Sequence, residues 1–279
     1  MKINAKDLLR SHLKQKKSIG AFNVSSIEAI RAVFEVAHSL QLPALIETSE
    51  GEARYLTPEL ICELCEYYSK KHSVDYALHL DHGKDLDFIK ECLKCGYNSI
   101  HILYAEAPYS KNIKMTKQAR NITNQYNAQL EGEVGVITLK YYKDKFEGEI
   151  EMTDPDEAIE YVNDTHVDSL AVSIGTESGR YKDAKHIDIE RLQKVHSLLR
   201  DIPLVLHGGS YLPKKVYREV MKHGITKINV NAELRVAYTD TLVENQKTNS
   251  DEYAPYRLLA GTCDAMKVVL KEKMSIFNS

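Results

Sequence analysis

The sequence predicts an α/β fold, a (β/α)8 TIM barrel with extra C-terminal helices, on three observations. Short apolar runs alternate with amphipathic segments eight times along the chain, as in folds built from repeated βα units. The apolar runs are rich in Ile, Val and Leu and barely alternate, which is typical of parallel strands covered by helices. The length of 279 residues suits one such barrel. An open doubly wound sheet is the alternative that this pattern allows.

We expect eight strands, each an apolar run that ends in polar or turn residues. They cover residues 19–24, 44–48, 76–81, 99–104, 128–133, 169–174, 203–207 and 226–230. Amphipathic patterns between them predict the surrounding helices, such as SIEAIRAVFEVAHSL after the first strand. Thr57-Pro58 and Asp154-Pro155 each place a capping residue before a proline and so mark two helix starts. From residue 251 onward, we expect further helices that pack on the barrel or contact another subunit.

The chain is expected to form one domain over residues 1–279, because no linker or low-complexity segment interrupts it. The longest segment without a pattern of its own, residues 135–154, follows the fifth strand. Loops of this length are often functional. In a barrel, this one would lie at the carboxyl ends of the strands, where active sites are built.

Charge and composition exclude several classes of function. The net charge is −3, so there is no bulk attraction for nucleic acid or for an anionic membrane. No apolar stretch approaches the roughly 18 residues that a membrane span needs, and the start MKINAKDLLRSHLKQKK is a charged amphipathic pattern without a signal sequence. We therefore expect a soluble cytoplasmic protein with a small-molecule substrate and neither a nucleic-acid nor a membrane partner.

Two C-x-x-C pairs raise the question of a structural zinc site. They are Cys62 with Cys65 and Cys92 with Cys95, and a fifth cysteine is Cys263. Both pairs fall within amphipathic helical patterns, where cysteines three residues apart share one face and can simply pack. We favour packing over zinc binding at these positions.

Polar residues collect where the expected strands end, and in a barrel they would converge on one pocket. Helix caps explain some of them, but imidazoles are not capping residues, so His82 and His207 indicate a functional site. The residues and segments at the strand ends are Asn23, Thr48-Ser49, Asp81-His82, Glu131, Glu133, GTESGRYK (175–182), HGGS (207–210) and NVNAE (229–233).

The segment HGGS indicates an anion-binding turn. Two glycines allow the backbone to turn with exposed N–H groups, and Ser210 adds a hydroxyl before a helix that starts near Pro213. Many strand–helix turns look alike, but Asn229 ends the next strand, and the last two strands of barrels often carry a phosphate site.

These motifs together resemble the class II (metal-dependent) ketose-bisphosphate aldolases, the family of fructose- and tagatose-bisphosphate aldolases. The resemblance covers essentially the whole chain, through AFNVSSIE, TSEGEARYL, LHLDHG, LEGEVG, TDPDEA, DSLAVSIGT, PLVLHGGS and ITKINV. It implies a carbon–carbon lyase that releases or uses dihydroxyacetone phosphate, or a close analogue, from a phosphorylated ketose. It also implies Zn²⁺ or another divalent metal as cofactor, and a homodimer or homotetramer.

The resemblance also implies residue roles. Asp81 matches the acid/base aspartate, His82 and His207 match two of the three histidines that hold the metal, and Glu133 matches a glutamate close to it. The metal would polarise the ketone while the carboxylate moves protons. The implied substrate-binding residues, with Lys182 added as a cation that could offset developing negative charge, are Asn23, Ser49, Gly179, Lys182, Gly208, Gly209, Ser210, Asn229, Val230, Asn231 and Ala232.

The sequence departs from the family at the centre of this pattern. Ser178 stands where the family has its remaining zinc histidine, and a serine hydroxyl is a poor zinc ligand. Leu103 replaces an aspartate at the end of the fourth strand, and Ala232 replaces a threonine. The segment VITLKYYKDK replaces the glycine-rich, acidic start of the mobile loop, and the D-P-R motif near the C-terminal region is absent.

Four hypotheses therefore stay open. The chain could be a metal aldolase in which Glu177, Glu133 or water completes the metal sphere. It could be a metal-independent or differently metallated lyase or isomerase on a related phosphate- or phosphonate-bearing substrate, with Arg180 or Lys182 offsetting charge. It could be an inactive sugar-phosphate-binding protein. It could also be a conventional aldolase whose changes only tune specificity.

Further polar residues have more ordinary interpretations. His79 and His101 have the spacing of inward-facing strand positions, and we expect them to be satisfied histidines of the core. The acidic run of Glu147, Glu149 and Glu151 is expected to be a solvated face, although one of them could serve as a loop base. Lys227 could suggest a Schiff-base lysine, but ITKIN resembles the metal-dependent family at a non-catalytic lysine.

Overall fold

Eight parallel strands close into a barrel in the computed structural model, with each strand paired to its neighbours in chain order. The structure describes residues 1–136, 151–177, 179 and 187–279. The strands are β1 Ile19–Asn23, β2 Ala44–Ser49, β3 Tyr76–Gly83, β4 Ser99–Ile102, β5 Gln129–Val134, β6 Ser169–Val172, β7 Leu204–Leu206 and β8 Ile225–Val230. The pairing of β1 with β8 closes the barrel. The predicted (β/α)8 barrel is confirmed, and the open sheet is excluded.

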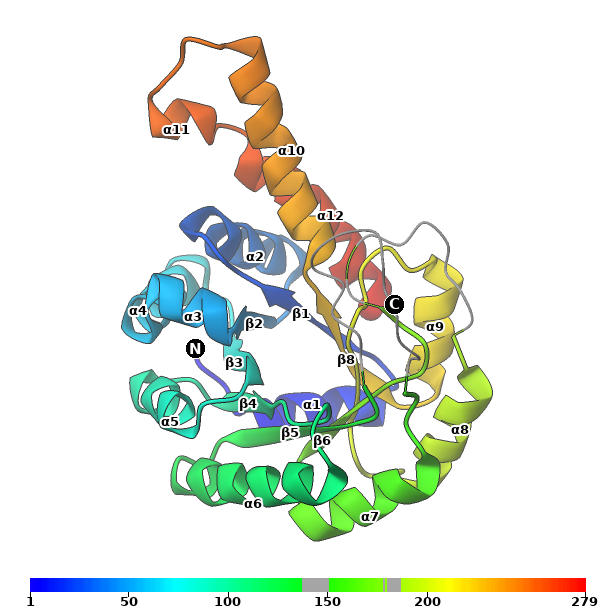
Figure 1. The fold of residues 1–279 in the computed structure, drawn as a ribbon. Helices are drawn as coiled ribbons and strands as arrows, with labels where there is room; N and C mark the ends of the chain where they lie inside the picture. Colours follow the sequence, from blue (N-terminus) through cyan, green and yellow to red (C-terminus); the bar gives the residue numbers. More distant parts are fainter. Residues whose placement is uncertain (137–150, 178, 180–186) are drawn as a thin grey trace.

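Helices surround the barrel, as Figure 1 shows. The amino-terminal helix α1 packs its buried Leu8 and Leu9 in a cluster with Ile19 of β1. The helices are α1 Ala5–Gln15, α2 Ile27–Leu40, α3 Glu50–Leu56, α4 Pro58–His72, α5 Leu86–Cys95, α6 Tyr109–Gln125, α7 Pro155–Thr165, α8 Ile189–Leu198, α9 Lys214–Lys222, α10 Ala232–Thr248, α11 Pro255–Leu258 and α12 Thr262–Phe277. None of the helices in these described ranges is long and apolar enough to cross a membrane.

The two expected helix starts behave differently. Asp154 caps α7 as predicted, because its side chain accepts hydrogen bonds from the backbone N–H groups of Asp156 and Glu157. The side chain of Thr57 makes no cap hydrogen bond, although α4 does begin at Pro58. Thr57 is both the C-cap residue of α3 and the N-cap residue of α4. Its φ of 66° and ψ of 138° place its backbone outside ordinary N-cap geometry. The predicted helix start at Thr57-Pro58 is therefore confirmed, although Thr57 holds the N-cap position without a hydrogen bond from its side chain.

Three expected strands end earlier than predicted. Strands β4, β6 and β7 stop at Ile102, Val172 and Leu206. After β6, Ser173 pairs instead with the chain that enters α7: its N–H donates to Thr153 Oγ1 at 2.7 Å, and its carbonyl accepts from the N–H of Thr153 at 2.9 Å. The backbone of Ser173 therefore bonds the loop before α7 instead of continuing β6.

The C-terminal helices form two distinct parts. Helix α12 packs against α2 and α10, and its Leu270 and Phe277 join the core. Helices α10 and α11 extend beyond the ring of barrel helices (Figure 1), where Tyr253 and Tyr256 are exposed. The prediction of extra C-terminal helices is confirmed.

The cysteine pairs pack within helices. Cys65 of α4 and Cys92 of α5 are buried, Cys62 and Cys95 are half-buried, and all of them are free thiols. No group of residues with metal-binding geometry in the described part of the chain includes a cysteine. Burial raises the pKa of the Cys62 thiol to about 12, so it is not a ready thiolate ligand.

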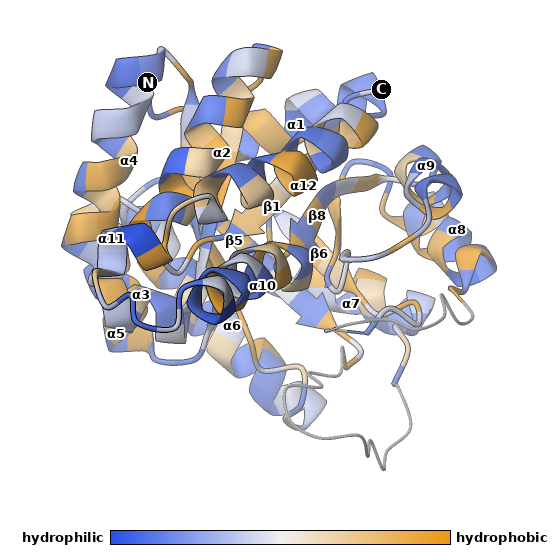
Figure 2. Ribbon diagram, turned by 90° about the horizontal axis from the view of Figure 1, so that it is seen from above, coloured by the Kyte–Doolittle hydropathy of each residue, from blue (hydrophilic) through white to orange (hydrophobic). Residues whose placement is uncertain are grey.

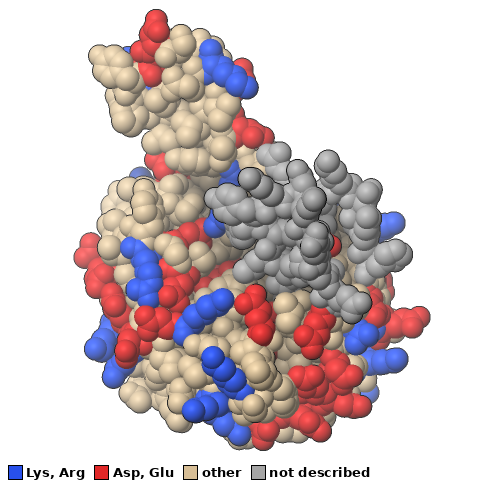
Figure 3. All heavy atoms as spheres, viewed as in Figure 1, with Lys and Arg blue, Asp and Glu red and all other residues tan. Residues whose placement is uncertain are grey.

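Charged and hydrophobic residues are distributed differently on the surface and in the interior of the barrel. Figure 2 shows that the helices carry hydrophobic and hydrophilic residues on different sides. Figure 3 shows Lys and Arg interspersed with Asp and Glu over the visible face, with no extended basic surface there. The barrel interior is less usual, because it includes the fully buried polar side chains Glu47, His79, Glu131 and Lys227.

Candidate metal centre and active site

Four side chains from three sectors of the barrel meet at the carboxyl ends of the strands. Asp81 and His82 lie on β3, His101 on β4, and His207 directly after β7. Each offers one atom that could bind a metal, and these atoms all lie within 4.8 Å of one another. Asp81, His101 and His207 are buried, while His82 is half-buried. The predicted convergence of Asp81, His82 and His207 is confirmed in this geometry.

The three imidazoles form a nearly equilateral triangle. The ring centroids of His82 and His101 are 5.1 Å apart, those of His82 and His207 are 5.1 Å apart, and those of His101 and His207 are 4.8 Å apart. Three imidazoles bound to one tetrahedral Zn²⁺ at about 2.0–2.1 Å would have centroids about 5 Å apart. The rings meet edge to face rather than stacked. These residues therefore fit one divalent ion.

The protonation of these imidazoles is set by their surroundings. Burial lowers the pKa of His82 to about 4, so its ring is neutral near pH 7, as a metal ligand must be. Burial also disfavours the charged form of His101, but the carboxylates of Asp81 and Glu133, 3.5 Å and 3.1 Å from its ring nitrogens, outweigh it and raise the pKa of His101 to about 10. Nδ1 of His82 and Nδ1 of His207 have no hydrogen-bond partner in the described part of the chain.

Asp81 is held from several sides. Its Oδ1 accepts from Nδ2 of Asn229 at 3.3 Å, and its Oδ2 accepts from Nδ2 of Asn23 at 3.5 Å and lies 3.3 Å from Nε2 of His82. Burial would raise the pKa of Asp81, but the neighbouring histidines and Lys227 lower it well below its usual value. The carboxylate is therefore charged and fixed in direction, as a proton acceptor must be.

The backbone at His82 is unusual for a strand. Its φ is 55°, in the left-handed region that costs a non-glycine residue about 1–3 kcal/mol. The pairing of β3 with β4 shifts register between Leu80 and Gly83, across this residue. The distortion turns the imidazole toward His101 and His207.

A buried network supports the site from below. Nε2 of His207 donates to Oε1 of Glu131 at 2.9 Å, and Lys227 Nζ lies 3.0 Å from Oε2 of Glu131 and 3.0 Å from Oε2 of Glu47. Lys227 Nζ is also 3.1 Å from Nε2 of His79. Burial would raise the pKa of Glu131, but Lys227 and His207 hold it well below its usual value. Glu131 can therefore orient His207 through Nε2, which leaves Nδ1 as the ring nitrogen that could bind a metal.

Glu133 lies beside the triangle rather than within it. Its Oε2 is 3.1 Å from Nε2 of His101. It is buried on β5, and hydrogen bonding from His101 lowers its pKa although burial opposes this. Glu133 is thus next to His101 but is not one of the four side chains whose ligand atoms lie within 4.8 Å of one another.

The HGGS turn meets the end of β8 as predicted. The N–H of Gly209 donates to the carbonyl of Asn229 at 3.0 Å, and Oγ of Ser210 accepts from the N–H of Asn231 at 3.3 Å. A Cβ at Gly209 would lie 2.8 Å from the carbonyl oxygen of Asn229, so only glycine allows this contact. Gly208 has a φ of 65°, which glycine adopts without strain.

Asn23, which bonds Asp81, shares one partner, Glu52, with Ser49. Nδ2 of Asn23 donates to Oε2 of Glu52 at 3.3 Å, and Ser49 forms a reciprocal capping box with Glu52 at the start of α3. Both residues are thus near the site as expected, but their polar groups are already in use.

A family model described as "Fructose-bisphosphate aldolase class-II" matches residues 3–279. The chain belongs to the class II fructose-bisphosphate aldolase family. This membership confirms the resemblance drawn from the sequence motifs and makes the protein an aldolase-type lyase.

Solved structures of other aldolases share the fold over nearly their whole lengths. The YdjI aldolase from Escherichia coli K12 is 26% identical with a TM-score of 0.84, covering 99% of this chain and 97% of that one. A proposed fructose-1,6-bisphosphate aldolase from Coccidioides immitis is 25% identical with a TM-score of 0.86, covering 98% and 96%. Fructose-bisphosphate aldolase from Campylobacter jejuni, 18% identical with a TM-score of 0.83, covers 99% and 95% and shows the fold alone.

His101 is the site residue that sequence reasoning missed in this aldolase. It was expected to be a core histidine, and it is indeed fully buried, but its ring forms one corner of the imidazole triangle. One signal could have found it: His101 points inward two positions before Leu103, where the family has an aspartate, in a chain that lacks the histidine at position 178. His79, by contrast, is a core histidine bonded to Ser99 and Lys227, as predicted.

Other predicted site residues have no observed part in the cluster. Lys182, Ser178, Arg180, Glu147 and Glu149 lie outside the described residues. Gly179 is described with a φ of 120°. Val230 is buried at the end of β8, and Ala232 is the first residue of α10, so at these two positions the backbone rather than the side chain would face a ligand.

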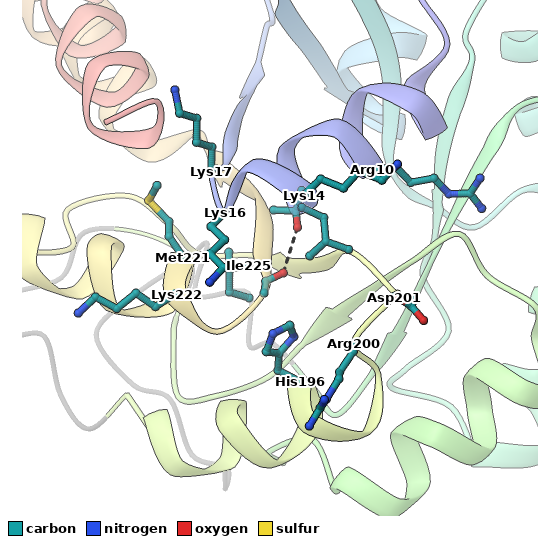
Figure 4. Close-up of a pocket in the computed structure, with 13 residues that line it drawn as sticks. Arg10, Lys14, Lys16, Lys17, His196, Arg200, Asp201, Met221, Lys222 and Ile225 are labelled. Carbon is teal, nitrogen blue, oxygen red and sulfur yellow. Dashed lines mark hydrogen bonds between the residues drawn. The ribbon is translucent and has the colours of Figure 1, made fainter.

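An open cavity of about 510 Å³ lies at the opposite end of the barrel, where the strands begin. Figure 4 shows several of its cationic side chains, including Arg10, Lys17 and Lys222, extending away from the space they border. Among the described residues it contains none of the candidate metal groups. We assign it no catalytic role.

Proposed function

We propose that this enzyme is a metal-assisted aldolase that cleaves or forms a carbon–carbon bond next to the carbonyl of a phosphorylated ketose. Dihydroxyacetone phosphate, or a close analogue, would be released or used. The observation that carries the proposal is the meeting of Asp81 with three imidazoles, each from a different strand end, at one point of the barrel mouth.

His82, His101 and His207 would hold the divalent ion, Zn²⁺ or a similar metal, with Glu133 beside it. His101 would supply the third imidazole that the sequence lacks at position 178. The bound ion supplies Lewis-acid polarisation of the ketone and stabilises negative charge on the enediolate.

The remaining roles follow from the contacts of each residue. Asp81 would exchange a proton with the hydroxyl at the bond that breaks or forms, while Asn23 and Asn229 hold its carboxylate in direction. The HGGS turn and the Asn229–Asn231 segment would bind the phosphate end, because the glycine turn after β7 lies against the segment that leads into the start of α10.

A second candidate is a metal-independent lyase or isomerase acting on a related phosphate- or phosphonate-bearing substrate. The position of His101 between two carboxylates favours it, since Asp81 and Glu133 lie 3.5 Å and 3.1 Å from its ring nitrogens and, acting against burial, raise its pKa to about 10. An imidazolium at this point could offset negative charge that develops on the substrate.

Elemental analysis of gently purified enzyme, combined with an assay of dihydroxyacetone phosphate release with and without chelator, separates the two candidates. Stoichiometric metal and chelator-sensitive release are the results that we expect. Full activity after metal removal would favour the metal-independent lyase. Binding of a sugar phosphate without any turnover, in the presence of metal, would contradict both.

We also propose that the enzyme is a cytoplasmic homodimer or homotetramer. The free state of all five cysteines is consistent with a reducing compartment. The exposed Tyr253 and Tyr256 on the projecting part of the chain are the kind of aromatic surface that subunit contacts use.

A further inference from the structure

Glu52 is a buried carboxylate at the mouth of the site that the proposed mechanism does not use. It lies on α3 with 8% of its surface exposed. Its Oε2 accepts hydrogen bonds from the N–H of Ser49 at 2.8 Å, Oγ of Ser49 at 2.9 Å and Nδ2 of Asn23 at 3.3 Å. These three donors belong to two residues, Asn23 and Ser49, that we expect to contact the substrate.

The other oxygen of this carboxylate pairs with Arg235 of α10. Nη2 of Arg235 lies 2.6 Å from Oε1 of Glu52. The side chain of Arg235 is 35% exposed, so it forms the outer edge of this side of the mouth. The guanidinium of Arg235 forms an ion pair with the carboxylate of Glu52.

Glu52 contacts Asn23, Ser49 and Arg235 rather than the imidazoles. The amide of Asn23 is placed between the two carboxylates, 3.3 Å from Glu52 and 3.5 Å from Asp81. In the proposed mechanism, Asp81 exchanges a proton with the hydroxyl at the reacting bond, and the HGGS turn binds the phosphate. The end of the substrate away from this phosphate, its far end, then extends toward Asn23 and Glu52.

The chemistry of this side does not suit a second phosphate. A phosphate dianion only accepts hydrogen bonds in practice, whereas Glu52 and Asp81 are acceptors and the hydroxyl of Ser49 already donates to Glu52. Among the described residues that make these contacts, two carboxylates face one cation, Arg235. Sugar hydroxyls, which donate as well as accept, match this arrangement, and like charges oppose a phosphate.

We propose that Glu52 is a specificity-determining residue that selects substrates whose far end carries hydroxyls instead of a second phosphate. The inference rests on the proposed aldolase function and names its substrate class: a ketose monophosphate, formed from dihydroxyacetone phosphate and an uncharged polyhydroxy aldehyde.

A purely structural role would not require the charge of Glu52. A capping box is formed by Glu or Gln alike, so Glu52→Gln keeps the helix start while removing the carboxylate. Glu50→Gln is the matched control: Glu50 belongs to the same helix but bonds Arg54 and the backbone of Lys84, away from Asn23.

The test is aldol condensation of dihydroxyacetone phosphate with D-glyceraldehyde or with D-glyceraldehyde 3-phosphate, read as the ratio of kcat/KM values. We expect the wild-type enzyme to favour the uncharged aldehyde at least 10-fold. Glu52→Gln should shift the ratio at least 10-fold toward the phosphorylated aldehyde, and Glu50→Gln should leave it unchanged. Thermal melts of both variants establish that they are folded.

Three outcomes would overturn this assignment. They are a wild-type enzyme that uses both aldehydes equally, one that prefers the phosphorylated aldehyde, and a Glu52→Gln variant with the wild-type ratio. Condensation with neither aldehyde by the metal-loaded enzyme would instead contradict the proposed aldolase function, and this assignment with it.

Discussion

Asp81 and His101 differ in how each can be assigned to the candidate site: one from its sequence motif, the other only from its position in the structure. Asp81 was assigned to the chemistry from its motif, and its contacts with Asn23, Asn229 and His82 agree with that role. His101 could not be assigned in the same way, because an inward-facing histidine on a strand is usually a core residue. Only the distances to His82 and His207 reveal its part in the cluster.

Replacing the carboxylate of Asp81 by an amide tests its role in proton transfer. Asp81→Asn keeps the size of the side chain but removes its basicity, so kcat should fall by about 10²–10⁴-fold. The midpoint of thermal unfolding should not fall by more than a few degrees, because the amide can still bond its neighbours. Steady-state kinetics and a thermal melt measure the two effects, and a kcat within threefold of wild type would remove Asp81 from the mechanism.

At the scale of elements, all eight strands and the glycine-rich HGGS turn could be predicted, because apolar runs and glycine pairs are local signals. Register and strand ends could not. The early end of β6 depends on Thr153, which is close in space to Ser173 but 20 residues away in the chain. The left-handed backbone at His82 likewise depends on the pairing of β3 with β4.

The contact between the HGGS turn and β8 offers a test at this scale. Gly209→Ala places a methyl group 2.8 Å from the carbonyl oxygen of Asn229, so the turn must move away from the strand. We expect KM for the phosphorylated substrate to rise at least 10-fold, with a smaller effect on kcat, since the metal ligands lie elsewhere. Gly51→Ala is the control, because a Cβ at Gly51 meets nothing within 4 Å. An unchanged KM for Gly209→Ala would argue against a phosphate site at this turn.

At the scale of the whole molecule, one buried network of charged side chains in the barrel contributes to stability and also positions His207 of the candidate site. Lys227 of β8 bridges Glu47 of β2 and Glu131 of β5, and Glu131 in turn holds His207. Sequence reasoning discounted Lys227 as a Schiff-base residue, and its paired position deep in the barrel agrees with that. Its partners Glu47, Glu131 and His79 could not be named from the sequence, because they come from strands far apart in the chain.

Lys227→Met would leave two buried carboxylates without their cation. Removing one partner of a buried ion pair typically costs about 3–5 kcal/mol, so the free energy of unfolding should fall by roughly that amount. Glu131 would also orient His207 less well, and metal affinity should fall about 10–100-fold. Chemical denaturation and metal titration measure these changes, with exposed Lys14→Met as the control. A loss below 1 kcal/mol with unchanged metal affinity would contradict the supporting role of the network.

The most direct test of the three-imidazole centre is X-ray absorption spectroscopy of the zinc-loaded enzyme, which reports the atoms around the ion without reference to activity. The account predicts one ion per chain with three imidazole nitrogens at about 2.0–2.1 Å, and two in His101→Ala. Sulfur in the metal shell, or an unchanged shell in His101→Ala, would contradict it.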